Sequence, residues 1–343
     1  MIQCWITFQR EKTMKIRTIL MSTLITLVLT TTSAAAELKS ITIGTNPSGS
    51  TFFLIGSSFA KMFQEKLGIR STTQPFAGSS VYLPALDVGD LVLGLSSTVD
   101  AGLAYKGEAG YPSKMKKLRS LGRIWTIPYA LITRADSGII TADDLKGKSV
   151  MGNMPTSQAL TQINTAIIHS GGLELGDVNF MISGGLMDGI NAVAEGRVDA
   201  APVATTMPVL VEKNASVAGG LRIVGNGSKA VDGFFSNAVS GTRNAIGKQV
   251  KKRPFIIGDT AIVAYDTLLI ASTKLSDNDA YALTKAIYDN WEELQANVGP
   301  LRSVAQNILA LENPTIPYHA GAIRFYKEVG LWTEAHDTHQ TKF

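Results

Sequence analysis

The chain is nearly free of cysteine, and it is poor in histidine, aromatic and charged residues. Its 343 residues include one cysteine, Cys4, and four histidines, while aromatic residues make up 7% and charged residues 17%. A lone cysteine excludes an internal disulfide and a cysteine-rich metal site. The sequence also lacks low-complexity tracts and long runs of one charge, so its composition is globular and its length suits two domains.

Residues 1–36 have the pattern of a cleaved secretory signal. Lys15 and Arg17 precede an apolar stretch at residues 19–29, which is shorter than the roughly 20 residues that a membrane-spanning helix needs. A small-residue site at residues 34–36 predicts cleavage before Glu37 and export to the periplasm. Residues 1–13 lie ahead of the basic region, so Met14 is an alternative start.

Removal of this signal also removes the apparent basic character of the chain. Four of the 32 Lys and Arg residues and one of the 28 acidic residues lie in it, which leaves 28 bases, 27 acids and a net charge of +1. Nucleic-acid binding would need a clustered basic face, and we expect no nucleic-acid partner.

Glycines recur at matching intervals in two halves of the chain. The first set is Gly44, Gly78 and Gly89, and the second set is Gly152, Gly185 and Gly196. The intervals are 34 and 11 residues in the first set and 33 and 11 in the second. Around them, apolar runs typical of strands alternate with helical periodicity, which predicts an α/β fold of two lobes. Ligands of such sheets bind beyond the carboxyl ends of the strands.

Two similar extended runs, residues 129–133 and 265–271, separate the copies from each other and from the last part of the chain. We expect them to cross between the lobes as a hinge. The predicted domains are lobe 1 at 37–130, lobe 2 at 131–264, and a hinge return with C-terminal helices at 265–343 that pack mainly on lobe 1. The C-terminal helices are expected from Ser276 onward, at 300–311 and at 319–329.

Motifs for nucleotide binding and hydrolysis are missing. The loop GTNPSGSTFFLIG at 44–56 is followed by no Gly-Lys-Ser/Thr, and Gly147-Lys148-Ser149 has Ala142 where a P-loop has glycine. No G-x-S-x-G motif occurs, so an enzyme has little support and no cofactor is expected.

The histidines and carboxylates offer little chemistry. His336 and His339 form the only close histidine pair, in a polar tail that we expect to fray, so no metal site is predicted. Asp188, Glu195 and Asp199 lie near one another, and an acid–base pair is the alternative to structural roles. We favour a structural role for Asp199, which would accept N–H groups from a strand-end loop.

What remains is a set of loops rich in glycine, serine and threonine. Helix N-termini carry partial positive charge, and together with hydroxyl groups they can bind a carboxylate without a lysine. For any single hydroxyl, plain helix capping is an equally good explanation. The case for a binding cleft rests on the convergence of several such loops.

Five segments together resemble one family: GTNPSGSTFFLIG, FAGSS, ADSGIITADDLKGKSV, EGRVDAA and YHAGAIRFYKEVGLW. They are similar to the TAXI group of periplasmic solute-binding proteins of TRAP transporters. The resemblance implies a type II periplasmic-binding-protein fold, two α/β lobes joined by a hinge, in a monomer that closes on a small organic anion. Glutamate, 2-oxoglutarate and related dicarboxylates are the implied ligands. The implied partner is a TRAP membrane permease with small and large subunits, fused or paired.

The resemblance also implies ligand-binding residues in both lobes. In lobe 1 they are Gly49, Ser50, Thr51, Phe52, Phe53, Gly78, Ser79, Ser80, Ser97 and Thr98, and in lobe 2 they are Thr156, Ser157, Gln158, Thr205 and Thr206. We expect the carboxylate on the helix that starts at Ser50 and Thr51, with Thr156 and Ser157 closing over it. Two family tyrosines are replaced by Phe52 and Phe53 and an aspartate by Val92, which predicts a more apolar pocket.

Three rivals to the TRAP interpretation remain open. The first is the binding protein of an ABC importer with the same fold. The second is a periplasmic sensor that presents its ligand to a signalling receptor. The third is an enzyme, which no motif in the sequence favours.

Overall fold

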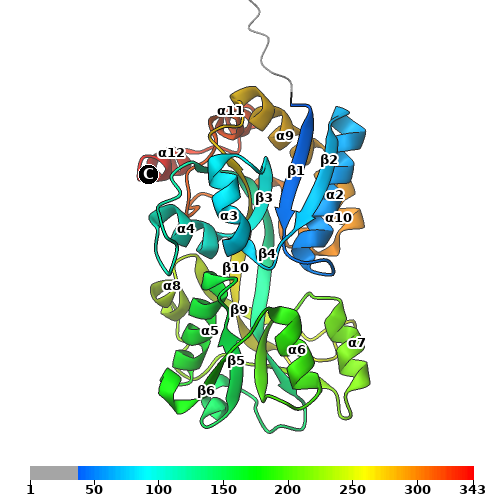
Figure 1. Cartoon of the computed structure of the whole chain (residues 1–343), viewed down its shortest axis with the longest axis vertical. Coiled ribbons are helices and arrows are strands. Elements are labelled where there is room, and N and C mark those ends of the chain that lie inside the picture. The colour runs from blue at the N-terminus through cyan, green and yellow to red at the C-terminus, as the bar shows by residue number, and fades with distance from the viewer. Residues whose placement is uncertain (1–37) are drawn as a thin grey trace, which may run out of the picture. The chain divides into compact units, whose positions relative to one another are not determined.

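The structure is a computed structural model that describes residues 38–343. The predicted signal and its cleavage before Glu37 lie outside these residues. The described part of the chain forms two α/β lobes that share one ten-stranded sheet (Figure 1).

Lobe 1 contains the first copy of the glycine-spaced repeat. Its elements are β1 (Ser40–Thr45), α2 (Thr51–Leu67), β2 (Arg70–Pro75), α3 (Ser79–Val88), β3 (Leu93–Ser97) and α4 (Thr98–Lys106). The central strand β1 pairs in parallel with both β2 and β3. The apolar face of α2 is buried, as the helical spacing of Ile55, Phe59 and Phe63 requires.

Lobe 2 contains the second copy. Its elements are β5 (Ser149–Asn153), α5 (Gln158–Ser170), β6 (Asn179–Ile182), α6 (Leu186–Ala194), β7 (Ala200–Ala204) and α7 (Val209–Ser216). Here β5 is the central strand and pairs in parallel with β6 and β7, so the strand order matches that of lobe 1. Gly89 (φ 81°) and Gly196 (φ 72°) turn the chain after the second helix of each copy, in the left-handed region that glycine enters without strain. The predicted repeat is confirmed.

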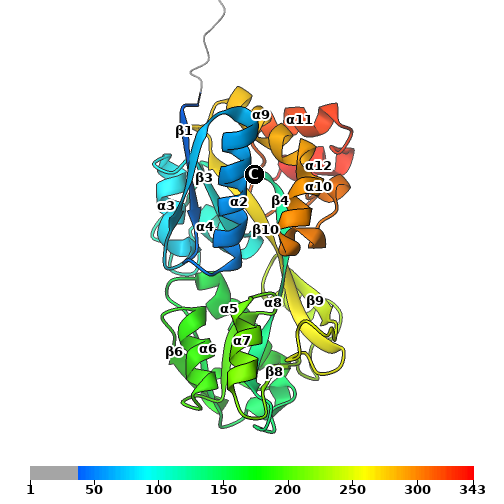
Figure 2. The same ribbon diagram turned by 90° about the vertical axis from the view of Figure 1, so that its right-hand side faces the viewer.

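Two long antiparallel strands connect the lobes. They are β4 (Leu118–Arg134) and β10 (Thr260–Ser272), and they contain the two runs expected as the hinge. The residues of β10 near Thr267 pair with β3 of lobe 1, whereas Tyr129 of β4 pairs with Ala204 of β7 in lobe 2. Figure 2 shows both strands running from one lobe into the other.

Shorter elements complete both lobes. In lobe 2, β8 (Leu221–Val224) pairs with β4, and β9 (Thr242–Gly247) pairs with β10. The remaining elements there are α8 (Phe234–Ala238), η1 (Ala142–Leu145) and η2 (Leu175–Asp177). The C-terminal part contains α9 (Asp277–Asp289), α10 (Trp291–Asn297), η3 (Gly299–Ser303), η4 (Gln306–Ile308), α11 (Ala320–Glu328) and α12 (Glu334–Gln340). Of these helices, α9 packs against both α2 and α11, beside lobe 1 (Figure 2).

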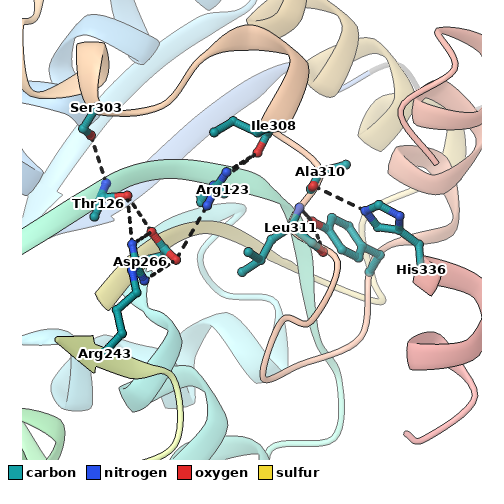
Figure 3. A network of polar contacts seen from close by, with 10 residues as sticks. Arg123, Thr126, Arg243, Asp266, Ser303, Ile308, Ala310, Leu311 and His336 are labelled. Atoms are coloured by element: carbon teal, nitrogen blue, oxygen red, sulfur yellow. Dashed lines mark hydrogen bonds and ion pairs between the residues drawn. The ribbon is translucent and has the colours of Figure 1, made fainter. Parts of the chain in front are cut away.

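The helix expected at residues 300–311 is wrong. The segment forms only the short 3₁₀ turns η3 and η4, with extended backbone at Val304 and Ala305 between them. The Val304 carbonyl accepts from Trp291 Nε1 (2.9 Å) and Gln295 Nε2 (2.8 Å), which take the place of the Ile308 amide that would bond to it in a continuous helix. The guanidinium of Arg123 on β4 donates to the carbonyl of Ile308 (2.9 and 3.1 Å; Figure 3), and the Arg123 amide donates to that of Leu309 (2.8 Å).

The expectation of a frayed tail is also wrong. The tail forms α12, and His336 is buried on it, with its ring 4.9 Å from the ring of Trp332. His336 Nε2 contacts the carbonyl of Ala310 at 3.3 Å (Figure 3). This apolar and polar anchoring explains why the tail is ordered despite its polar composition.

Candidate functional site

A cavity of about 60 Å³ lies between the lobes, near the carboxyl ends of β1 and β3. Its polar lining consists of Asn46, Ser50, Thr51, Ser79, Ser97, Asp100 and Ser157. Its apolar and aromatic lining consists of Phe52, Trp125, Ile127, Tyr129, Leu160, Leu186, Ala204, Met207 and Tyr265. Both lobes and both hinge strands contribute, which is the position expected for a ligand in sheets of this type.

The N-terminus of α2 presents backbone N–H donors to this cavity. Gly49 (φ 87°) turns the chain into the helix, and the Ser50 hydroxyl caps it by accepting from the Phe53 amide at 3.1 Å. The amides of Thr51 and Phe52 have no acceptor among the described residues. The positive end of the helix dipole adds to these free donors, so this turn is suited to an anion.

Two buried side chains beside this turn also lack partners. Thr51 Oγ1 and Trp125 Nε1 have no hydrogen-bond partner within residues 38–343, although Thr51 is 5% and Trp125 2% exposed. An unpaired buried donor costs about 1–3 kcal/mol, and both residues line the cavity. A ligand that accepts from both would remove this cost.

Aromatic rings form the walls of the cavity. The rings of Phe52 and Trp125 meet edge to face at 6.0 Å, and those of Tyr129 and Tyr265 lie 5.7 Å apart. Tyr129 donates to Asn164 Oδ1 at 2.8 Å, which fixes the orientation of its ring. Burial raises the pKa of Tyr129 well above its ordinary value, so this wall stays neutral.

Asp100 is the charged residue of the lining, and it is 1% exposed at the start of α4. From lobe 1 its carboxylate accepts from the Ser79 hydroxyl and lies 3.2 Å from the Tyr111 hydroxyl. From lobe 2 it accepts from the Ser157 hydroxyl (3.1 Å) and the Ala159 amide (3.0 Å). Asp100 therefore caps α5 from the opposite lobe. Burial raises the pKa of the Asp100 carboxyl, although the hydrogen bonds act in the opposite direction.

Close backbone contacts reinforce this bridge between the lobes. The Gln158 amide donates to the Ser80 hydroxyl at 3.2 Å. A Cβ atom placed on Gly78 would lie 2.1 Å from the Thr156 carbonyl oxygen, so only glycine allows this approach. The structure thus has the lobes in direct contact.

The structure distributes the predicted binding residues over several environments. Those that line the cavity are Ser50, Thr51, Phe52, Ser79, Ser97 and Ser157. Those that form the adjoining contact between the lobes are Gly78, Ser80, Thr156 and Gln158. Gly49 is exposed in the turn before α2, and Phe53 is half-buried outside the lining.

The remaining predicted residues lie at other places. Thr98 is buried at the start of α4, where its carbonyl accepts from Thr315. Thr205 and Thr206 line a different hollow together with residues 250–253. That hollow lies beside Pro208 at the start of α7.

Sequence reasoning missed Asp100 and Trp125. Asp100 lies two residues after Thr98, the second of the strand-end hydroxyls, which was the available signal. Trp125 lies in the long strand β4, where an aromatic residue reads as core. The predicted role of Asp199 is confirmed, because its carboxylate accepts from the Ser149 amide (2.8 Å) and hydroxyl (2.7 Å).

Residues 43–330 match the model of the NMT1-like family. The chain belongs to the NMT1-like family. This NMT1-like protein also has the type II periplasmic-binding-protein fold expected from the sequence, with its two α/β lobes and paired hinge strands.

Solved structures resemble the protein at the level of the fold alone. The periplasmic aliphatic sulphonate binding protein SsuA from Escherichia coli is 14% identical, with a TM-score of 0.45 over 89% of this chain and 87% of that one. PhnD1 from Prochlorococcus marinus, in complex with methylphosphonate, is 12% identical, with a TM-score of 0.49 over 76% and 83%. The substrate binding protein of an amino acid ABC transporter is 14% identical, with a TM-score of 0.44 over 76% and 96%.

Two other features bear on the site. Within residues 38–343, no helix has the length and apolar character to cross a membrane. The same residues contain no group of three His, Cys, Asp or Glu side chains arranged to hold a metal ion.

Proposed function

We propose that this NMT1-like protein is a periplasmic solute-binding protein that captures a small organic anion between its lobes and delivers it to a membrane importer. The observation that carries the proposal is the open N-terminus of α2, with the unpartnered Thr51 hydroxyl and Trp125 indole beside it. Delivery would require the lobes to separate about β4 and β10.

A carboxylate fits this turn by its hydrogen-bonding capacity. It can accept from the amides of Thr51 and Phe52, from the Thr51 hydroxyl and from Trp125 Nε1, and its two oxygens offer about four acceptor positions. The aromatic walls then surround the carbon skeleton of the ligand. Of the site residues predicted from the sequence, we propose Ser50, Thr51 and Phe52 as the contacts of this carboxylate. Glutamate, 2-oxoglutarate and related carboxylates are the first ligands to test.

Two types of importer are compatible with the proposal. The family match names the NMT1-like family and does not name the TAXI group, so we favour an ABC importer over a TRAP permease. Uptake that collapses on ATP depletion supports the ABC importer, and uptake that collapses only when the ion gradient is dissipated supports the TRAP permease. A sensor role would instead require binding to the outer domain of a receptor.

An enzyme is not part of the proposal, because the one carboxylate in the described lining, Asp100, is buried and also accepts from the Ala159 amide. The hydroxyls of Ser79 and Ser157 both donate to Asp100, which is itself saturated with donors and buried under α5. A hydroxyl in this arrangement caps a carboxylate and has no base left to activate it.

Thr51→Val tests the proposed anion site. The substitution keeps the shape of the side chain and removes its hydroxyl, and a lost hydrogen bond to a charged group weakens binding by about 10- to 100-fold. Thr45→Val is the matched control, because Thr45 is another buried, unpartnered threonine of the same lobe that lies outside the lining. Calorimetry with the acid that most raises the melting temperature gives the affinities.

Two results would overturn the proposal. One is a screen in which no organic anion stabilises the protein while a sugar or a cation does. The other is an equal effect of Thr51→Val and Thr45→Val on affinity, which would remove the N-terminus of α2 from the site.

A further inference from the structure

The repeat gives the cleft two equivalent helix N-termini, but only one of them is already bonded to a carboxylate of the protein. Both α2 and α5 follow the first strand of their copy, and residues of both first turns line the cavity. The first turn of α2 has free amides and an unpartnered hydroxyl at Thr51. The first turn of α5 already holds a carboxylate, that of Asp100.

Asp100 has no acceptor capacity left for a ligand. The Ser79 and Ser157 hydroxyls donate to Oδ2, and the Ala159 amide donates to Oδ1. The hydroxyls of Tyr111 and Ser80, which bond to each other at 2.9 Å, also lie 3.2 and 3.4 Å from Oδ1. A carboxylate has about four lone-pair positions, and these groups surround all of them. Recognition of a ligand ammonium by Asp100 would require one of these bonds to break.

The charge in the described lining is also of one sign, because Asp100 is its charged residue. Within the described residues, the lining contains no Lys, Arg or His to balance a second negative group beside Asp100. A ligand with two carboxylates would place its second charge near a like charge that is shielded from water, where repulsion is stronger than in solvent.

We propose that Asp100 fills the second anion position of the cleft, so that the protein accepts ligands with one anionic group and rejects dianions. The proposal rests on the function proposed above and narrows its ligand class. It makes Asp100 a residue that determines specificity through the first turn of α5. The carbon chain of the ligand would end among apolar side chains such as Leu160 and Met207 instead of in a second carboxylate site.

The direct test is calorimetry on the wild-type mature protein with acids of matched chain length. The probes are 2-oxopentanoate, with one carboxylate, and 2-oxoglutarate, with two. We expect 2-oxopentanoate to bind at least about tenfold more tightly than 2-oxoglutarate, because repulsion by the Asp100 carboxylate acts against the second carboxylate of the ligand.

Asp100→Asn and Asp199→Asn form a matched pair of variants. Both remove a carboxylate that accepts from an amide and a serine hydroxyl, but Asp199 bonds to Ser149 in lobe 2, outside the lining. We expect Asp100→Asn to shift the affinity ratio of 2-oxoglutarate to 2-oxopentanoate by at least about tenfold toward the dianion. Asp199→Asn should leave the ratio unchanged.

The possible outcomes separate this proposal from the function on which it rests. If wild-type protein binds 2-oxoglutarate more tightly than 2-oxopentanoate, or if Asp100→Asn folds and leaves the ratio unchanged, the role of Asp100 is refuted and anion binding stands. If no mono- or dicarboxylate of three to six carbons binds, the carboxylate-binding function falls, and the role of Asp100 falls with it. Should Asp100→Asn fail to fold, the wild-type ratio alone decides.

Discussion

The amide of Ala159 in lobe 2 donates a hydrogen bond of 3.0 Å to the carboxylate of Asp100 in lobe 1. This bond joins the start of α5 to the start of α4 across the cleft, and the Ser157 hydroxyl adds a second one. The same carboxylate therefore helps to hold the lobes together and occupies a position that a ligand could otherwise take. Asp100 therefore links the contact between the lobes to the proposed ligand specificity.

The contact between Gly78 and Thr156 predicts how closure can be blocked. In Gly78→Ala the added methyl group would lie 2.1 Å from the Thr156 carbonyl oxygen, so the lobes cannot approach. We expect ligand affinity to fall at least about tenfold, because closure would no longer contribute to binding. Small-angle scattering in excess ligand should show a more open protein than the wild type.

Gly185→Ala is the control for this variant. Gly185 precedes α6 at the equivalent position of the second copy, its backbone is likewise extended, and no atom lies within 4 Å of an added Cβ. Equal affinities of the two variants would contradict the role of the Gly78 contact.

Asp100 also predicts a pH dependence of closure. Burial raises the pKa of Asp100 when the lobes are in contact, and opening the cleft would admit water and lower this pKa toward its ordinary value. The closed state then binds the proton of Asp100 more tightly than the open state does. This proton binding stabilises the closed state fully at a pH below the open-state pKa, and the stabilisation is lost as the pH rises through the raised pKa of the closed state.

No other titrating group near Asp100 should obscure this effect. The titratable side chains that face it are Tyr82, Tyr111 and Tyr265, and burial raises the pKa of each, so they stay neutral. Scattering of the ligand-free protein between about pH 4 and 8 should show more closed protein on acidification. Asp100→Asn should flatten the curve, and a wild-type profile that opens on acidification would refute the assignment.

Trp125 provides a spectroscopic prediction. Its indole N–H has no partner among the described residues and lies at the proposed anion site, so bound ligand should change its fluorescence. Trp125→Phe should abolish the change and weaken binding about tenfold. Trp332→Phe is the control, because Trp332 donates to Asp337 in the C-terminal part, and a signal that follows Trp332 would place the ligand elsewhere.

The hinge contains an ion-pair network that should matter for stability. Asp266 on β10 is 5% exposed, and it accepts from Arg243 on β9 (3.0 and 3.2 Å) and from the Thr126 hydroxyl on β4 (2.6 Å; Figure 3). Arg243→Leu leaves this buried carboxylate without its nearest cation. Since Arg243 itself is partly exposed, we expect the free energy of unfolding to fall by about 1–3 kcal/mol.

Lys248→Leu is the control for the network, because it breaks the exposed pair of Lys248 with Asp259 (2.6 Å) on the same part of lobe 2. Exposed pairs contribute little, so its denaturation midpoint should match the wild type. If both variants lose the same stability, burial of Asp266 does not set the strength of the network.

The repeat made most of the fold predictable from the sequence. The glycine spacings of the two copies, which differ by one residue at most, predicted the same strand and helix order in both lobes, because a left-handed turn such as that at Gly89 or Gly196 demands glycine. The helix predicted at 300–311 does not form because the side chains of Trp291 and Gln295 bond to the Val304 carbonyl, a tertiary contact that no local pattern reveals.

The candidate site was only half predictable. The turn at Ser50 and Thr51 follows from local helix-capping chemistry, which is visible in the sequence. Asp100 and Ala159 are 59 residues apart and meet only because the lobes are in contact. Thr205 and Thr206, which the family resemblance implied as binding residues, line a different hollow from the cavity.

The central claim is that the N-terminus of α2 binds the anionic group of the ligand, while the carboxylate of Asp100 stays bonded to the N-terminus of α5. A crystal structure of the protein with its best-binding acid tests this most directly. The account predicts a carboxylate on the Thr51 and Phe52 amides, within hydrogen-bond reach of the Thr51 hydroxyl and Trp125 Nε1, with Asp100 still bonded to Ala159. A ligand carboxylate bound to Ser157 and Ala159, with Asp100 displaced, would contradict it.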